Sequence, residues 1–358
     1  MSARLRAIAA ANDRIVADGR YVTEDGTEVV IGEAIAAAQA ATRLYGPEPV
    51  TMPERHAVSG AAKGSGASGA VGAAGTSRAT GAAGATGAAG APRTVTTPGT
   101  AAASGAALAT SATDATDATG TAFEVTDEDS LAAARRIIDE DHRNGPGTDG
   151  GVTGAGGTRG DGTPLGAAGV AVLNFASARN PGGGYVNGAK AQEEALCRAS
   201  ALYSCLLRAP EYYAVHRGTR DPFYTDRVIH SPGVPVFRDV RGELLNRPYT
   251  VGFLTSPAPN AGVIARRFPQ RTPEVPDVLI RRAERVLEVA AAHGYRALVL
   301  GAWGCGVFRN DPAEVAAAFA GHLTGGGRFS GRFDRVVFAV LGGPASSPAR
   351  DAFMRAFG

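Results

Sequence analysis

The alternation of apolar strand-like runs with helix-like segments from residue 167 onward places the tightest limit on how this chain can fold. Buried strands are typical of the runs GVAVLNFA, VIHSPGVPVF, YTVGFLTS, ALVLGAW and RVVFAVL, and helical patterns stand among them over 192–207, 276–293 and 312–323. Strands that alternate with helices of this length favour a mainly parallel sheet covered on both faces. We therefore predict a three-layer α/β/α fold with a mixed, mainly parallel sheet.

A segment of different composition, residues 56–122, precedes this region. It consists largely of Ala, Gly, Ser and Thr, with short repeats such as GAAGATGAAG, and it contains no aromatic residue. Ordering the backbone costs about 1–2 kcal/mol per residue, and such a segment buries too little apolar surface to offset that cost. We predict a disordered insertion here, and the similar composition of residues 144–166 predicts a flexible loop.

The two low-complexity segments divide the chain into parts. We predict that residues 1–55 form a helical extension. Its expected elements are helices over 5–17 and 33–44 and a hairpin that turns at Asp25-Gly26. This extension has no core of its own, so we expect it to pack on the main domain, residues 123–358. That domain opens with a helix for which Thr126 is the candidate N-cap.

Charge balance and cysteine content exclude several classes of protein. Lysine and arginine total 36 against 34 acidic residues, a formal net charge of +2, so we expect neither direct DNA binding nor membrane binding. No apolar run approaches the roughly 20 residues of a membrane span, and the N-terminus lacks the apolar core of a signal peptide. The three cysteines form no CxxC pair, and the six histidines show no HxH or HxxxH spacing that would indicate a metal. We therefore expect a cytoplasmic monomer with reduced thiols.

The first informative loop follows the strand that ends at Phe175. Three glycines, Gly182 to Gly184, remove every Cβ there, and after seven residues Gln192, Glu193 and Glu194 open a helix. Acidic residues in a first helical turn are often only partners of the helix dipole. Two adjacent carboxyl groups in a partly closed site cannot both ionise freely, so we expect one of them to be held protonated.

The second informative loop is LGAWGCGVFRNDPAE. Gly301, Gly304 and Gly306 follow a strand, and Asp311-Pro312 opens the next helix, which is typical of an anion site and equally of a tight structural turn. The loop lacks the GK[ST] ending of a nucleotide-binding P-loop, and no Rossmann GxGxxG opens a first βαβ unit. A diphosphate held beside an acid pair suits cleavage of a glycosidic bond.

The stretch PGGGYVNGAKAQEEALCRAS resembles the signature of the poly(ADP-ribose) glycohydrolases, a GGG followed after six to eight residues by QEE. Together with LNFASARNPGGG, HSPGVPVFRD, TSPAPN and GAWGCGVFRNDP, it resembles the microbial branch of that family, a catalytic macrodomain. The resemblance implies a glycosidase that hydrolyses ribose–ribose O-glycosidic bonds, mainly from the chain end, and releases ADP-ribose. It implies poly(ADP-ribose), ADP-ribose and ADP-ribosylated proteins as substrate, product and partners, and neither a cofactor nor a metal.

The resemblance also assigns roles. Glu194 would be the general acid and base, and Glu193 would hold ribose hydroxyls. The substrate-binding residues that it implies are Asn174, Ser177, Asn180, Gly182, Gly183, Gly184, Gln192, Gly304, Cys305, Gly306, Val307 and Phe308. Tyr185 and the loop 255–260 are candidates for contact with adenine. A non-catalytic ADP-ribose reader and a hydrolase of mono-ADP-ribosyl linkages stay open as alternatives.

Other residues near these motifs have two interpretations each. Trp303 either buttresses the second loop or lines the site. Cys305 either shapes the backbone or, with its pKa lowered near a helix N-terminus, acts as a nucleophile. Arg266, Arg267 and Arg271 either attract a polyanionic polymer or form an ordinary exposed surface.

Overall fold

A computed structural model describes residues 2–52, 115–116, 120–144, 169–342 and 347–358. Most of the predicted insertion, residues 56–122, and nearly all of the predicted flexible loop, residues 144–166, lie outside these ranges. At the described end of the insertion, Ala115–Thr116 and Ala122 already belong to strands. The sheet therefore takes in residues ahead of position 123.

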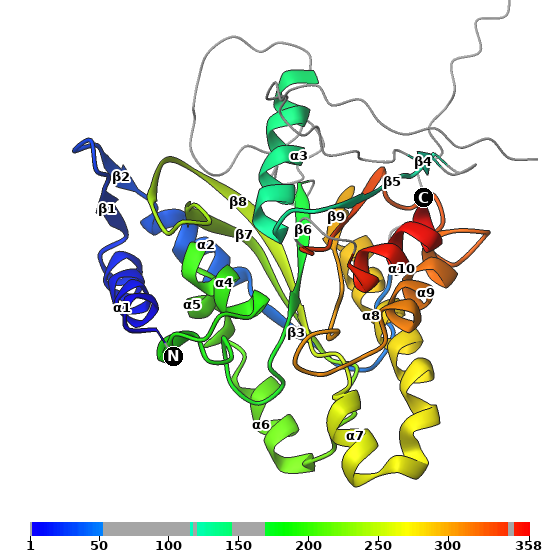
Figure 1. Ribbon diagram of the computed structural model, residues 1–358. Helices are drawn as coiled ribbons and strands as arrows, with labels where there is room; N and C mark the ends of the chain where they lie inside the picture. The colour runs from blue at the N-terminus through cyan, green and yellow to red at the C-terminus, as the bar shows by residue number, and fades with distance from the viewer. Residues whose placement is uncertain (1, 53–114, 117–119, 145–168, 343–346) are drawn as a thin grey trace, which may run out of the picture. The chain divides into compact units, whose positions relative to one another are not determined.

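The described residues form a sheet of eight strands in the order β3-β7-β8-β6-β9-β10-β5-β4 (Figure 1). Its strands are β3 (Arg43–Tyr45), β4 (Ala115–Thr116), β5 (Ala122–Thr126), β6 (Val170–Phe175), β7 (Val228–Arg238), β8 (Leu244–Ser256), β9 (Ala297–Leu300) and β10 (Arg335–Ala339). The inner pairs from β8 to β5 are parallel, whereas β3, β7 and β4 join antiparallel. The prediction of a mixed, mainly parallel sheet is confirmed.

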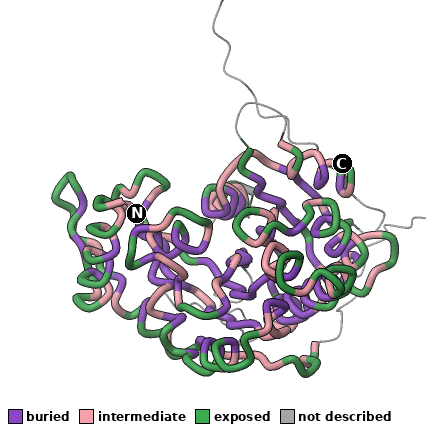
Figure 2. The backbone as a smooth tube through the Cα atoms, turned by 60° about the horizontal axis from the view of Figure 1, so that its bottom comes forward, coloured by how far each residue is buried: buried purple, intermediate pink, exposed green. Residues whose placement is uncertain are grey.

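Helices cover both faces of this sheet. They are α1 (Ala3–Asp18), α2 (Gly32–Ala41), α3 (Ser130–Asn144), α4 (Gln192–Ala199), α5 (Leu202–Leu206), α6 (Pro210–Thr219), α7 (Ala261–Arg267), α8 (Val275–Ala292), α9 (Pro312–Leu323) and α10 (Pro348–Phe357), with 3₁₀ turns η2 (Tyr185–Asn187) and η3 (Pro269–Glu274). Because successive side chains of a strand point to opposite faces, Leu173 enters the core under α8, α9 and α10. Val172 enters the core under α2 to α5. Figure 2 shows these strands buried and the outer segments exposed.

The leading segment contributes a strand as well as helices. After α1, the hairpin of β1 (Arg20–Val22) and β2 (Glu28–Val30) turns through Asp25-Gly26 as predicted. The predicted helix over 33–44 is wrong at its end, because α2 stops at Ala41 and the next residues form β3. Pairing with β7 gives that strand long-range backbone partners, and no local pattern in the sequence signals them.

The start of α3 also differs from the prediction. Thr126 is the last residue of β5 and does not cap the helix. Instead Asp129 Oδ1 accepts hydrogen bonds from the N–H groups of Leu131 and Ala132, at 2.9 and 3.0 Å. An aspartate at this position satisfies N–H groups that have no partner within the helix.

The predicted helix over 192–207 consists of two helices. Ser200 interrupts it with extended backbone angles, φ −142° and ψ 176°, and forms an isolated bridge with Val236 of β7. Its hydroxyl donates to the carbonyl of Leu196 at 2.7 Å. The break leaves α4 as a short helix whose first turn carries the acid pair.

A buried histidine of β7, His230, stacks against the half-buried His293. The rings of His230 and His293 lie 3.7 Å apart between centroids, and His230 Nε2 hydrogen-bonds with the Tyr295 hydroxyl at 2.8 Å. Burial lowers the pKa of His230 to about 3, with a smaller contribution from His293, and burial lowers the pKa of His216 on α6 to about 4. These rings are therefore neutral and belong to the core.

We expect the protein to lose stability as the pH falls from about 6.5 toward 4. In that window the unfolded chain protonates histidines of ordinary pKa, about 6.5, while the folded chain keeps His230 and His216 neutral. Each histidine that is protonated in the unfolded chain but neutral in the folded chain lowers the free energy of unfolding by up to about 1.4 kcal/mol for every unit by which the pH falls. Urea unfolding at pH 7, 6 and 5 measures the slope.

The matched comparison uses His230→Gln and a change of the exposed His142 to Gln. The first variant should show a shallower dependence of stability on pH, and the second should keep the slope of the wild type. An unchanged slope in His230→Gln would contradict the assignment.

Candidate active site

The site lies beyond the carboxyl ends of the parallel strands. The first loop, residues 176–191, follows β6, and the second loop, residues 301–311, follows β9, which lies next to β6 in the sheet. The loop after β8, the other neighbour of β6, meets them at the same edge. Ligands of open α/β sheets bind at this edge, so the topology brings the predicted motifs together.

Glu193 is a buried carboxyl group that is anchored to the first loop. Its Oε2 accepts a hydrogen bond from the Ser177 N–H at 2.7 Å, and its Oε1 lies 3.4 Å from Asn174 Nδ2. Burial raises the pKa of Glu193 to about 8, and the neighbouring charge of Glu194 raises it further against the lowering effect of the Ser177 N–H. The expectation that one member of the pair is held protonated is met by Glu193.

Glu194 is buried beside it and has one unpartnered oxygen. Its Oε1 accepts a hydrogen bond from the Gly184 N–H at 2.8 Å. Among the described residues no donor reaches its Oε2, although that atom is buried. Buried polar atoms usually have partners, so the hydrogen-bonding capacity of this carboxyl oxygen is unused within the described residues.

The glycines of the first loop are required by close packing around the acid pair. A Cβ on Gly183 would lie 2.5 Å from Glu194 Oε1 and 3.0 Å from Glu193 Oε2. Gly182 and Gly183 also have φ of +63° and +59°, which strains any other residue. The GGG run therefore lets the loop backbone close over the two carboxyl groups.

Gln192 directs its amide at the protein backbone. Its Oε1 accepts from the Phe175 N–H at 2.9 Å, and its Nε2 donates to the Leu173 carbonyl at 2.8 Å. Those backbone groups lie past Val172, the last residue of β6 that pairs with β9. The side chain thus acts as a short extension of the ladder and fixes α4 against the strand end, while a contact with ribose stays a prediction.

The second loop presents unused backbone donors. Within the described residues, the N–H groups of Gly304, Gly306, Val307 and Phe308 have no hydrogen-bond acceptor. Consecutive free N–H groups in a glycine-rich loop form a concave anion site. This arrangement favours the anion interpretation of the loop over a purely structural turn.

Three buried contacts hold the second loop in place. Trp303, which is 1% exposed, donates from Nε1 to the Ser256 carbonyl at 3.0 Å, so it buttresses the loop. Asn310 Nδ2 bridges the carbonyls of Pro259 and Gly304, at 2.9 and 3.1 Å. Burial raises the pKa of Cys305 to about 12, which contradicts a reactive thiolate and favours the backbone-shaping interpretation.

Thr255, from the predicted loop 255–260, contacts the first group of site residues, because its hydroxyl accepts a hydrogen bond from Asn174 Nδ2 at 3.1 Å. Tyr224 also lies near the site, and the sequence did not indicate it. Tyr224 adopts φ +60° and its ring lies 5.9 Å from that of Phe308. Its conformation depends on long-range contacts and leaves no signal in the sequence.

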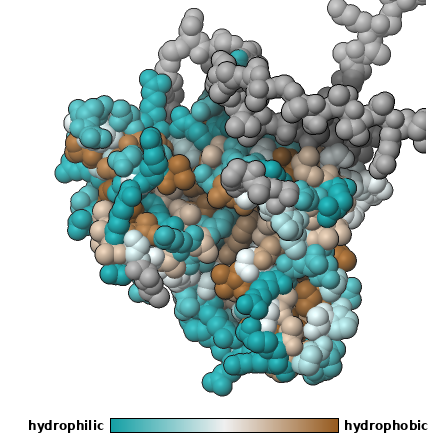
Figure 3. Space-filling view, in the orientation of Figure 1, coloured by the Kyte–Doolittle hydropathy of each residue, from teal (hydrophilic) through white to brown (hydrophobic). Residues whose placement is uncertain are grey.

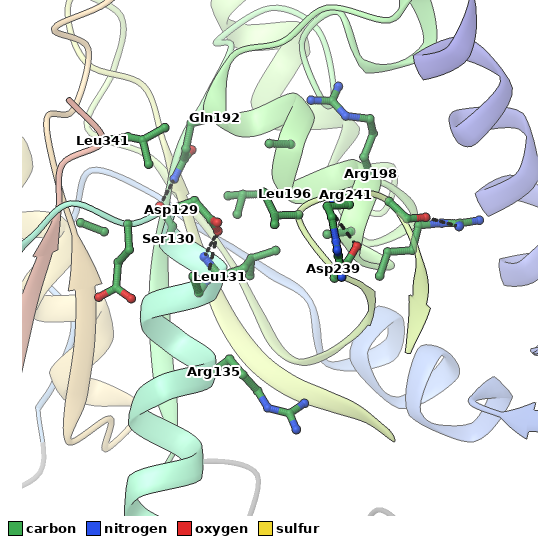
Figure 4. Close-up of a pocket in the computed structure, with 18 of the residues that line it drawn as sticks. Asp129, Ser130, Leu131, Arg135, Gln192, Leu196, Arg198, Asp239, Arg241 and Leu341 are labelled. Carbon is green, nitrogen blue, oxygen red and sulfur yellow. Dashed lines mark hydrogen bonds and ion pairs between the residues drawn. The ribbon is translucent and has the colours of Figure 1, made fainter. Parts of the chain in front are cut away.

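A cavity of about 950 Å³ adjoins the second loop and runs along α4. Gln192, Ser130 and Leu341 lie at one end of it, and Arg198, Asp239 and Arg241 lie at the other (Figure 4). Figure 3 shows a hollow with an apolar floor and hydrophilic borders. The cavity follows the face of α4 that carries Gln192 and Ala195, whereas Glu193 and Glu194 point to a different face of that helix.

The predicted site residues fall into two groups around this edge. Asn174, Ser177, Gly182, Gly183 and Gly184 surround the acid pair. Asn180 is exposed next to them, and its carbonyl accepts from Gly183. Gly304, Cys305, Gly306, Val307 and Phe308 form the second loop, where Val307 is 80% exposed.

Tyr185 is wrong as an adenine contact. The residue is 1% exposed, and its hydroxyl donates to the Ala9 carbonyl at 3.4 Å, so the ring is buried beneath the leading helix. In the loop 255–260, Thr255 is fully buried and the Asn260 side chain caps α7 by accepting from the Val263 N–H. Neither side chain offers a free apolar shelf.

Neither a metal centre nor a membrane span is found in the part of the chain that the structure describes. No group of three or more His, Cys, Asp or Glu side chains there has an arrangement suited to a metal ion. None of the helices there combines the length and the apolar composition needed to cross a bilayer.

Fold and site together define a macrodomain-like α/β enzyme with a buried acid pair. The family model "Microbial-type PARG, catalytic domain" matches residues 9–239, which include the first loop and the acid pair and end before the second loop. The chain therefore belongs to the microbial-type poly(ADP-ribose) glycohydrolase family and is a glycohydrolase. No curated protein sequence matches it.

Solved structures of the same family are similar over most of the chain. The poly(ADP-ribose) glycohydrolase of Thermomonospora curvata is 39% identical, with a TM-score of 0.70, and the match covers 99% of this chain and 100% of that one. The same enzyme bound to the inhibitor ADP-HPD matches with 39% identity, a TM-score of 0.69 and the same coverage. The enzyme of Deinococcus radiodurans in complex with ADP-ribose is 46% identical, with a TM-score of 0.55, over 66% of this chain and 84% of that one.

Replacing Gly183 with Ala should lower turnover of poly(ADP-ribose) by at least about 100-fold, because the new Cβ displaces the Glu194 carboxyl group by a substantial fraction of an ångström. Steady-state kinetics, with circular dichroism as a check of folding, measures the effect. Gly321→Ala on α9 is the control, since its Cβ meets nothing within 4 Å. Equal turnover in both variants would contradict the close packing described here.

Proposed function

We propose that this chain hydrolyses the ribose–ribose O-glycosidic bonds of poly(ADP-ribose), mainly from the chain end, and releases ADP-ribose. The observation that carries the proposal is the Glu194 carboxyl group, with one oxygen held by the Gly184 N–H and the other buried without a partner. The ligands of the relatives, ADP-ribose and ADP-HPD, support the same substrate class.

The proposed placement of an ADP-ribose unit follows from the two loops and the cavity. The diphosphate binds the free N–H groups of the second loop, at Gly304, Gly306, Val307 and Phe308. The adenosine enters the cavity where Cys305 and Gly306 line it, toward Phe175 and Leu341. The distal ribose then reaches Glu193 and Glu194, with Asn174, Ser177 and Asn180 near it.

The proposed chemistry assigns different roles to the two glutamates. In the complex with substrate Glu194 carries a proton, and it donates this proton to the ribose oxygen that leaves as the bond to the anomeric carbon breaks. The resulting carboxylate takes a proton from water while the water oxygen bonds to the same carbon, which restores the acid. Glu193 stays protonated at neutral pH, so its O–H is free to donate to a ribose hydroxyl while the Ser177 N–H holds its other oxygen.

The substitution Glu194→Gln should reduce kcat by about 100- to 10,000-fold, because an amide has the same shape but no acidic proton to transfer to the leaving oxygen. The amide oxygen still accepts from the Gly184 N–H, so folding and ADP-ribose binding should persist. Gel analysis of long polymer measures the release of ADP-ribose. Tight binding without turnover in the wild type would favour a reader, and early free oligomers would contradict cleavage mainly from the chain end.

The affinity for ADP-ribose should fall as the pH rises through about 8. Ionisation of Glu193 there adds a negative charge beside the bound diphosphate, whose own charge is constant in this range. Calorimetric titration between pH 6.5 and 9.5 measures the dissociation constant. The neutral variant Glu193→Gln should show a flat profile, and a decline equal to that of the wild type would overturn the assigned protonation state.

A further inference from the structure

An excess of unpaired arginines surrounds the catalytic end of the site. Exposed guanidinium groups occur at Arg179 on the first loop, Arg217 and Arg220 around the end of α6, Arg266 and Arg267 on α7, and Arg309 on the second loop. Among the described residues none of the six forms an ion pair, whereas Arg271 pairs with Glu274 and Asp221 and lies over the Phe223 ring. Of the predicted cluster Arg266, Arg267 and Arg271, the last is therefore engaged in contacts within the protein. The chain as a whole is nearly balanced in charge, so this local concentration of cations is not a general property of its surface.

Arg179 lies between the backbone anchors of the two glutamates. Ser177, two residues before it, donates to Glu193, and Gly184, five residues after it, donates to Glu194. Arg217 Nη1 donates to the Arg179 carbonyl at 2.7 Å and so ties α6 to this loop (Figure 1). Two exposed cations are thereby fixed to the same stretch of backbone that positions the acid pair.

Arg309 is held at the other loop. Its side chain packs over Gly262 of α7, where a Cβ would lie 3.0 Å from Arg309 Cδ, and the Gly262 N–H donates to the Phe308 carbonyl at 2.9 Å. Its backbone adopts φ +59°, an unusual conformation for a residue with a side chain. The second loop and α7 therefore fix this guanidinium next to the aromatic pair of Phe308 and Tyr224.

The direction of the substrate indicates what these cations meet. In the proposed placement the adenosine occupies the cavity on the Gln192 and Ala195 face of α4, and the anomeric carbon lies over the different face, where Glu194 points. The bond to be cut thus leads away from the cavity, toward the first loop and α6. The polymer unit on the leaving side carries its own diphosphate, with two negative charges, only a few bonds beyond that oxygen.

We propose that Arg179 and Arg217, with Arg309 across the opening, form a subsite for the diphosphate of the polymer unit on the leaving side of the scissile bond. The proposal rests on the proposed function, since it deepens the recognition of the same substrate. Guanidinium groups bind phosphate oxygens through paired N–H donors, which suits a diphosphate better than a single charge would. The subsite binds the polymer and not the released ADP-ribose, so it strengthens capture of the chain without retaining ADP-ribose.

The test compares two substrates in the full-length protein. One is long poly(ADP-ribose), and the other is ADP-ribose joined at its anomeric carbon to a neutral aryl alcohol, which lacks a leaving-side diphosphate. In the double variant Arg179→Gln/Arg217→Gln, the ratio of kcat/KM for polymer to kcat/KM for the aryl substrate should fall about tenfold or more, mainly through KM. The dependence of log kcat/KM for polymer on log salt concentration should become shallower by roughly 1 per lost contact.

The control and the opposing outcomes separate the subsite from the function. Arg355→Gln removes one exposed and unpaired cation on α10 and should leave the substrate ratio unchanged. A double variant that loses activity equally on both substrates, or on neither, would overturn the subsite, while Arg179→Lys/Arg217→Lys should restore part of the salt dependence. A wild type that cleaves neither substrate while folded would instead overturn the proposed function.

Discussion

The site depends on the hydrogen bonds between the first loop and the acid pair. Removing a carboxyl group from water costs several kcal/mol when nothing replaces its solvation, and here the N–H groups of Ser177 and Gly184 replace it. The exchange works only because Gly183 has no side chain to separate the loop from the helix. Glycine at this position is thus a packing requirement, and the burial that accompanies it raises the pKa of Glu193.

The two glycine loops do different work, although both follow parallel strands. The first loop directs the N–H groups of Ser177 and Gly184 inward to the carboxyl groups of the acid pair, so these donors are used within the protein. The second leaves its N–H groups open, and buried contacts of Trp303 and Asn310 keep it from collapsing onto itself. An acid pair that is fixed in place and an anion cradle that is held open are thereby combined at one sheet edge.

Local sequence patterns were sufficient for the features that are local in the structure. β6, β9 and β10 agree with the predicted segments because parallel strands buried on both faces read as continuous apolar runs, and α8 and α9 agree because their apolar residues repeat with the helical period. β3 and the break at Ser200 were missed, since both depend on β7, which is distant in the sequence. The sequence motifs located the acid pair and the second loop. The hydrogen bonds of the Gln192 amide to the backbone and the turn at Tyr224 depend on tertiary contacts, which the spacing of residues in the sequence does not indicate.

The edge strand β3 has a consequence for how a minimal catalytic unit is defined. It covers the N-terminal end of β7, an 11-residue strand whose other side is occupied by β8. A fragment trimmed to the α/β region that begins near β5 would leave a row of bare amides and carbonyls on β7, a template for intermolecular strand addition and aggregation. The first 45 residues therefore supply the strand that covers this edge of β7, and they should be kept in a minimal catalytic fragment.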